Sequence, residues 1–474
     1  MKDICQKSRT LITHKMKLNK NLGFILFLAL TVTFTACKKE EGCTDVLATN
    51  YDSDAEEDDD SCEYPVVSQE TDFSLSFEEN GNSHEDPGVS ASSLVPSNTL
   101  SAGNAPTDNW FDNVTYKGAF GSSNWTNGWT LYDGYNPTAV PTTEVEITGT
   151  VVTSGSTESW TNDNVYILNG FCFVEGALNI QEGTIIKGAE GSGEDAAALI
   201  IARGATINAT GTATQPIIFT YEGDPLDGSV SNSTRGQWGG IIILGAATLN
   251  SSPGVTQIEG IPTNEPRGEY GGNNDSDNSG TISYISIRHG GSDIGAGNEI
   301  NGLTLGGVGS GTTIEYVEVI ANEDDGVEFF GGVARTKHIL TAYCGDDSFD
   351  YDEGFRGLGQ FWCAVQASDD GDRGGEHDGG TEPETATPYA TPVIFNATYI
   401  GNGEGRALTF RDNAGGQYHN SIFVNWAKGV DIENLDSEQD SYKQFQDGEL
   451  ALAGDVFWDI GAGTASNDLF TISE

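Results

Sequence analysis

Basic residues are scarce in this chain. Its 474 residues include 22 Lys and Arg but 71 Asp and Glu, which gives a formal net charge of −49. Such a surface repels the phosphates of nucleic acids and of anionic lipids, so we exclude a nucleic-acid partner. The same charge would concentrate divalent cations, or it would simply keep an exposed protein soluble.

Long hydrophobic runs are also missing. The apolar run at residues 22–32 is shorter than the about 20 residues of a transmembrane helix. It follows basic residues and precedes Thr35-Ala36-Cys37, so it is typical of an export signal. The ending resembles a bacterial lipoprotein signal, which implies a signal peptide at residues 1–36 and a lipid on Cys37. Residues 38–41, KKEE, resemble the signal that sends Bacteroidota lipoproteins to the cell surface. We therefore expect a lipid-anchored, surface-exposed protein of the outer membrane; the alternative is an ordinary periplasmic lipoprotein.

Cysteine is rare, and its positions separate two regions. Cys43 and Cys62 bracket a short acidic segment, and we expect them to form a disulfide because an exported protein meets an oxidising compartment. Residues 37–64 would form an anchor and an acidic disulfide module, which resembles a GCTD…NY…DD-SC module of Bacteroidota surface proteins. Residues 65–108 are rich in Ser, Asn, Glu, Pro and Gly, which predicts a flexible linker.

No segment has the apolar spacing of an amphipathic helix. Short runs of Val, Ile, Leu and Phe instead alternate with turns that contain many of the 62 glycines. This pattern predicts an all-β fold, a single-stranded right-handed parallel β-helix over residues 109–440, with a C-terminal cap at 441–474. Aromatic residues between 110 and 129 would cap the first coil. A β-sandwich is less compatible, because Asn-Gly and Asp-Gly hairpin turns are scarce.

Four short rows in the second half align with one another: residues 327–330, 349–352, 375–378 and 430–433, with residues 407–410 as a further row. Alternate side chains of a strand face opposite sides of the sheet. The apolar set, which includes His377, would face the interior, where we expect a packed core histidine rather than a base. The other set would stack carboxylates on the outer wall, and its central patch comprises Asp350, Asp352, Glu376 and Asp378.

The corners before these strands carry a second set of acids. They are Asp324, Asp325, Asp346, Asp347, Asp369 and Asp370. Like charges this close raise one another's pKa unless a cation lies among them. The candidates are Ca²⁺, which takes several carboxylate oxygens, and the nearby Arg356 and Arg373.

Many phrases of residues 116–380, such as YKGAFG, GQWGGIIILG, NEDDGVEFFGG and GDRGGEHDGG, resemble a family of uncharacterised Bacteroidota and marine bacterial surface proteins of β-helix fold. More distantly, the chain looks like the pectate-lyase-like superfamily, which contains lyases, hydrolases and inert adhesins. The resemblance implies the fold and no particular reaction.

Three interpretations of the acids remain open. The first is a scaffold stabilised by Ca²⁺ that contacts extracellular polysaccharide. The second is a polysaccharide lyase or glycoside hydrolase in which Asp350, Asp352, Glu376 and Asp378 serve as acid, base or metal ligands and Arg356 or Arg373 contacts an acidic sugar. The third is a solvated acidic face with no ligand.

Overall fold

The computed structural model describes residues 55, 100–294, 300–380, 383–435 and 439–473. Residues 1–54 and 56–99 lie outside the described residues, and with them the proposed signal peptide, the lipidated Cys37 and the Cys43–Cys62 disulfide. Among the described residues, no helix is long and apolar enough to cross a membrane.

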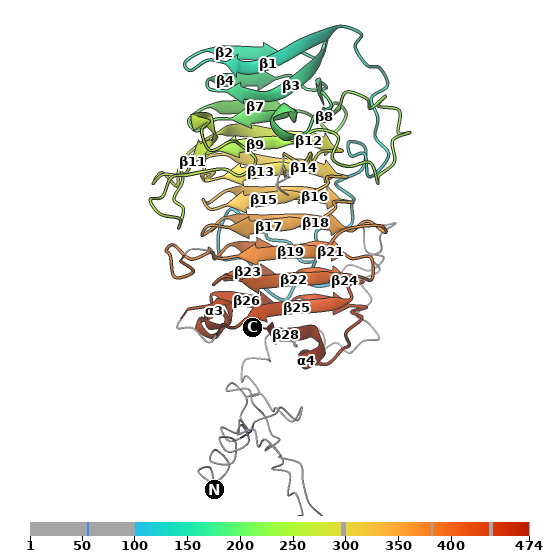
Figure 1. Cartoon of the computed structure of the whole chain (residues 1–474). Helices are drawn as coiled ribbons and strands as arrows, with labels where there is room; N and C mark the ends of the chain where they lie inside the picture. Colours follow the sequence, from blue (N-terminus) through green and yellow to red (C-terminus); the bar gives the residue numbers. More distant parts are fainter. Residues whose placement is uncertain (1–54, 56–99, 295–299, 381–382, 436–438, 474) are drawn as a thin grey trace, which may run out of the picture. The chain divides into compact units, whose positions relative to one another are not determined.

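Residues 144–473 form a right-handed parallel β-helix whose coils are stacked in one 26-stranded sheet (Figure 1). Each coil contributes strands to three faces, which we call A, B and C in the order in which the chain visits them. Face A contains β2 (Thr157–Trp160), β4 (Ala177–Ile180), β7 (Thr206–Thr210), β20 (Val393–Phe395), β23 (Gly416–His419) and β26 (Leu450–Ala453). Face B contains β5 (Ile185–Gly188), β8 (Ile217–Tyr221), β21 (Thr398–Ile400), β24 (Ile422–Val424) and β27 (Val456–Trp458).

Longer strands continue around a corner. The first two, β1 (Glu144–Val152) and β3 (Val165–Val174), run from face B to face C, whereas the next four run from face A to face B: β12 (Gly280–Arg288), β14 (Thr313–Ile320), β16 (Arg335–Ala342) and β18 (Leu358–Val365). Face C contains β6 (Ala198–Ile201), β9 (Ile241–Leu244), β13 (Leu303–Gly306), β15 (Val327–Phe330), β17 (Phe349–Asp352), β19 (Arg373–Asp378), β22 (Arg406–Arg411), β25 (Lys428–Glu433) and β28 (Phe470–Ser473).

Apolar side chains fill the interior of the coils. Phe329, Trp362, Phe349 and Tyr399 stack in sequence, with ring centroids 5.5, 4.6 and 5.4 Å apart. Each of these residues is at most 1% exposed. Because such large rings exclude water from the lumen, the polar side chains of face C point outward.

The C-terminal residues extend the solenoid. β26, β27 and β28 pair with β23, β24 and β25, so residues 450–473 build a further coil where the sequence suggested only a cap. Two short helices, α3 (Ser441–Asp447) and α4 (Ser466–Leu469), lie between these strands. The reason is that Leu450 and Leu452 keep the alternation of a strand, and Val456 and Phe457 are also buried in the interior.

The aromatic N-terminal segment, residues 100–136, does not cap the first coil as expected. It runs along the corner between faces A and B, from Gly103, whose N–H donates to Asn420 Oδ1 at 2.8 Å, back toward β1. Trp125 packs edge-on against His338 at 5.3 Å, and Trp129 packs against Tyr284 at 5.5 Å. We call this element the flank segment. It covers a stack of aromatic side chains that would otherwise be exposed at this corner.

The loop between β9 and β12 covers part of the outer side of face C. It contains the antiparallel pair β10 (Thr256–Gln257) and β11 (Glu269–Tyr270), and its apolar residues Leu249, Ile258 and Ile261 pack on Phe330 and Leu244. This loop therefore forms one border of the outward carboxylates that follow on β15 and β17. The described residues also contain two short 3₁₀ helices, Gly193–Asp195 and Pro266–Gly268.

Candidate functional site

The strand register brings the carboxylates of face C into a column. Glu328 on β15 pairs with Asp350 on β17, which pairs with Glu376 on β19. The sequence therefore aligned the first three rows correctly. Phe329 and Tyr351, which directly follow Glu328 and Asp350, are 1% exposed and face the lumen. Because side chains alternate along a strand, the carboxylates point away from the interior.

The row at residues 407–410 is shifted by one residue from the alignment expected from the sequence. Thr409, and not Leu408, pairs with Glu376 and Asp431, because Leu408 and Phe410 are both fully buried inside the coil. The shift places Arg411 beside Asp378 on the outer wall. The position that pairs with Asp378 therefore holds a positively charged side chain, whereas the alignment expected from the sequence placed Phe410 there.

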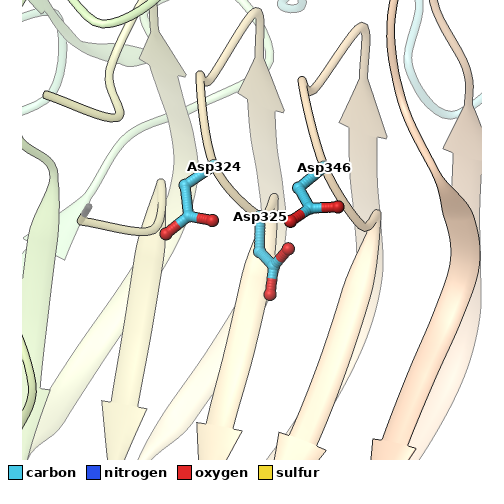
Figure 2. Close-up of side chains that lie close together, drawn as sticks. All are labelled: Asp324, Asp325 and Asp346. Carbon is cyan, nitrogen blue, oxygen red and sulfur yellow. The ribbon is translucent and has the colours of Figure 1, made fainter. Parts of the chain in front are cut away.

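The corner acids form a second group beside the column. Ligand oxygens of Asp324, Asp325 and Asp346 all lie within 4.8 Å of one another, and Figure 2 shows these three carboxylates converging from two neighbouring coils. A second triad of the same compactness contains Asp325, Glu328 and Asp350. A third contains Asp346, Asp347 and Asp372. We call these carboxylates, together with Asp352, Glu376 and Asp378, the acidic wall.

Asp369 and Asp370 do not join the acidic wall, which corrects the expected corner set. The turn that leads to face C is longer in this coil than in the preceding one. Ala342 pairs with Val365 and Phe349 with Gly375, so the chain advances 349 − 342 = 7 residues on one coil and 375 − 365 = 10 on the next. The longer turn moves both aspartates outward. They lie 3.1 and 3.7 Å from the guanidinium of Arg235 instead.

Two arginines neutralise one end of the acidic wall. Arg373 Nη1 lies 3.2 Å from Asp347, 2.9 Å from Asp372 and 3.0 Å from Glu376. Arg411 Nη1 lies 3.0 Å from Glu376, and its Nε donates to Asp378 at 2.6 Å. Arg373 was expected in this patch, whereas Arg411 was missed. Arg356, the other expected candidate, pairs with Asp275 at 3.3 Å.

The other end of the acidic wall has a different set of partners. Asp325 Oδ1 accepts the backbone N–H of Asp347 at 2.9 Å, and Glu328 Oε2 accepts the side-chain amide of Asn301. Asp350 Oδ1 is buried without a hydrogen-bond partner in the described part of the chain. Burial raises the pKa of each of the three carboxyls well above its ordinary value, and the neighbouring carboxylates raise it further.

Most of the acidic wall is less exposed than the solvent-facing wall that the sequence suggested. Asp325 is 7% exposed, Glu328 8% and Asp378 9%. The outer loops explain the difference, since Asn250 donates to Gly379 O at 2.6 Å and so bridges two of them over face C. Asp346 remains exposed, so we call the first triad open. We call the second triad closed, because each of its carboxylates is buried or half-buried and none is exposed.

A cavity of about 210 Å³ lies at the far border of the acidic wall. Its lining comprises Asn250, Ser251, Asp352, Glu353, Gly380, Pro383 and Ala386. Burial raises the pKa of Asp352 to about 7, a backbone hydrogen bond from Glu353 opposes the rise, and Asp378 adds to it. Glu353 accepts the hydroxyl of Tyr270 at 2.5 Å. Burial also raises the pKa of Glu353, so both carboxyls that line the cavity are shifted toward the protonated form.

His377 lies in the interior, as expected. It is fully buried, stacks on Tyr351 at 4.1 Å and is 2.8 Å from the hydroxyl of Tyr418. Burial lowers its pKa to about 3. The histidine is therefore neutral and cannot reach a ligand on the outer wall.

Comparison with known proteins agrees with this architecture. The family model described as "Pectate-lyase like beta helix domain" matches residues 151–471, which include every strand from β2 to β27 and the first half of β28. No curated protein and no solved structure matches the chain.

Proposed function

The chain belongs to the pectate-lyase-like β-helix family, and from this premise we propose that it is a surface-exposed lipoprotein whose acidic wall binds Ca²⁺ and contacts extracellular glycan. Its role would be structural or adhesive. The signal-like N-terminus, Cys37 and the resemblance to Bacteroidota surface proteins support the location.

The observation that carries the proposal is the uneven distribution of charge along the acidic wall. Where β19 contributes Glu376 and Asp378, the guanidinium groups of Arg373 and Arg411 lie 2.6 to 3.0 Å from these carboxylates. One and two coils earlier, Asp325, Glu328 and Asp350 form an equally compact group without an arginine or lysine ion pair in the described structure. A bound cation would fill at this end the role that the guanidinium groups fill at the other.

Ca²⁺ is the cation that this chemistry favours. Hard carboxylate and carbonyl oxygens suit Ca²⁺, Mg²⁺ and Mn²⁺, while thiolate or imidazole ligands would be expected for zinc. The acidic wall offers only oxygen ligands, on separate coils, and Ca²⁺ tolerates irregular sets of about 6 to 8 of them.

Glycan contact would use the open triad of Asp324, Asp325 and Asp346. Because Asp346 is exposed, an ion held there would keep coordination positions that face solvent. Sugar hydroxyl or carboxylate oxygens could occupy these positions. The large negative charge of the surface makes direct binding of an acidic glycan unfavourable without such an ion.

Thermal unfolding with Ca²⁺ or with EDTA tests the cation. We expect Ca²⁺ to raise the melting temperature and EDTA to reverse the increase. Asp346→Asn should weaken glycan retention on a polysaccharide affinity gel, whereas Asp369→Asn, which removes an exposed carboxylate paired with Arg235, should not. A melting curve that Ca²⁺ leaves unchanged would refute the proposal.

The location needs its own experiment. Cys37→Ser should release the protein from the membrane fraction and abolish incorporation of labelled palmitate. Protease added to intact cells should degrade the wild-type protein if it faces outward. Survival of the protein in intact cells would favour a periplasmic location.

A second candidate function, a polysaccharide lyase or glycoside hydrolase, is favoured by the cavity beside Asp352. Glycosidases need one protonated and one ionised carboxyl. Asp352, with its pKa near 7, could be the acid, and Asp378, held by Arg411 at 2.6 Å, could be the base. Burial lowers the pKa of Arg373, but the carboxylates of Asp347, Glu376 and Asp372 outweigh this effect and raise it. Arg373 is therefore a poor proton acceptor. Asp352→Asn should abolish release of reducing ends if this activity exists, and it should leave Ca²⁺ binding in place.

A further inference from the structure

Asp325 belongs to a column of equivalent corner positions, one on each coil. Along the stack, the side chains of this column are first neutral, then acidic and then basic. The pairing of Leu303 with Val327 places Asn301 one coil before Asp325, and Gly302 N donates to Asp325 O at 3.0 Å. Asp347 follows on the next coil. The later positions are basic, since Arg373 pairs with Arg406 and Arg406 with Lys428.

Asn301 is directed at the closed triad of Asp325, Glu328 and Asp350. Its side-chain nitrogen donates to Glu328 Oε2. Its side-chain oxygen has no hydrogen-bond partner in the described structure, although the residue is only 2% exposed. A buried carbonyl oxygen without a donor is unfavourable, and a cation would satisfy it.

No lysine or arginine forms an ion pair with these three carboxylates in the described structure. Arg373 is engaged by Asp347, Asp372 and Glu376. Arg411 is engaged by Glu376 and Asp378. Asp350 Oδ1 is also buried without a hydrogen-bond partner in the described residues. Two buried oxygens on different coils therefore lack a hydrogen bond: one belongs to this group of carboxylates, and the other to the asparagine that donates to it.

We infer that Asn301 Oδ1 is the neutral fourth ligand of a closed Ca²⁺ site made with Asp325, Glu328 and Asp350. The inference rests on the proposed Ca²⁺ binding by the acidic wall and assigns one ion to the interior of that wall. The Asn301 nitrogen keeps its hydrogen bond to Glu328 while the oxygen faces the ion. Three carboxylates, each with one or two oxygens, and one amide oxygen can supply about 4 to 7 ligand atoms, close to the number that Ca²⁺ takes.

The closed site would differ in role from the open triad. Asp325 and Glu328 are 7% and 8% exposed, so an ion beside them has little room for a glycan ligand. It would instead join β13, β15 and β17, because its ligands come from these three coils. Loss of this ion should therefore lower stability, and loss of an ion from the open triad should lower glycan contact.

Calorimetric titration of the full chain with CaCl₂ tests the inference, with Asn301→Leu and Asn301→Asp as a matched pair. Leucine has nearly the shape of asparagine but no ligand atom, and we expect Ca²⁺ affinity at one site to fall by about tenfold or more. Aspartate keeps an oxygen, and it should bind Ca²⁺ at least as tightly as the wild type. The melting temperature of Asn301→Leu should lose most of its response to CaCl₂.

The outcomes separate the inference from the proposed function. A wild-type chain that binds no Ca²⁺ would overturn both. Wild-type binding that persists unchanged in Asn301→Leu would overturn the inference alone. If Asn301→Leu does not fold, Asn301→Asp decides, because loss of Ca²⁺ binding in a variant that retains the oxygen would contradict the role of Asn301 as a ligand.

Discussion

Arg373 Nη1 lies 3.2 Å from Asp347 Oδ2, and the side chain of Asp347 is only 1% exposed. This pair joins two coils of face C. It shows how the protein accommodates a buried carboxylate when a cation is built into the chain. Burial still raises the pKa of Asp347, and Glu376 and Asp346 contribute, while Arg373 opposes the rise.

The first prediction concerns this pair. Arg373→Met should lower the free energy of unfolding by about 3 kcal/mol, because it leaves a buried carboxylate without its partner. Ca²⁺ should recover part of the loss if the acidic wall accepts cations. Chemical denaturation of the variant with and without CaCl₂ measures both effects. Arg335→Met, which removes an arginine from face A, is the control, and an equal loss in both variants would contradict the argument.

The sequence predicted the fold because period-2 alternation and glycine-rich corners recur along most of the chain. It also aligned Glu328, Asp350 and Glu376 correctly, since apolar residues flank each of them in the same order. It misplaced Leu408, because Ala407, Leu408 and Phe410 are all apolar and allow two alignments. Only the packing of Leu408 inside the coil decides between them.

Three further features could not be predicted from local patterns. The position of Asp369 depends on the length of the turn before β19, which changes the spacing by three residues relative to the preceding coil. The flank segment depends on contacts across the chain, such as Trp129 with Tyr284, that no local period encodes. Asn301 was overlooked because an isolated asparagine before a strand is common at a corner. Its importance follows only from the register that places it beside Asp325.

The second prediction concerns the attachment of the flank segment. Glu318 is fully buried and accepts the backbone N–H groups of Leu131 and Tyr132, each at 2.9 Å, and the hydroxyl of Ser286 at 2.5 Å. Glu318→Gln replaces one acceptor by a donor and should cost about 2 kcal/mol. Hydrogen exchange should show faster exchange of the two amides. Unchanged protection at residues 131 and 132 would refute the role of Glu318.

The third prediction is a pH dependence in the absence of divalent cations. Burial raises the folded-state pKa of Asp352 from 3.8 to about 7, so the folded protein binds more protons than the unfolded chain between these values. The contribution of Asp352 to stability should therefore be complete below about pH 4, and it should be lost as the pH rises toward 7. Asp325, Glu328 and Asp350 are shifted in the same direction.

Melting temperatures from pH 4 to 8 in EDTA measure this dependence. Asp352→Asn should flatten the profile, because asparagine does not titrate. Added Ca²⁺ should reduce the loss at high pH by stabilising the ionised carboxylates. A melting temperature that rises with pH in both the wild-type protein and Asp352→Asn would contradict the predicted direction.

The fourth prediction concerns His377, which lies between Glu376 and Asp378 in the sequence. Burial lowers its pKa to about 3, so its ring should remain neutral from pH 5 to 8, and its NMR signals should not titrate there. His377→Phe keeps a ring stacked on Tyr351 but removes the partner of Tyr418, which retains Tyr399 at 3.3 Å. The variant should lose about 1 kcal/mol of stability and keep Ca²⁺ binding. Titration of His377 near pH 6.5, or loss of glycan contact in a folded His377→Phe protein, would show that this ring acts beyond the core.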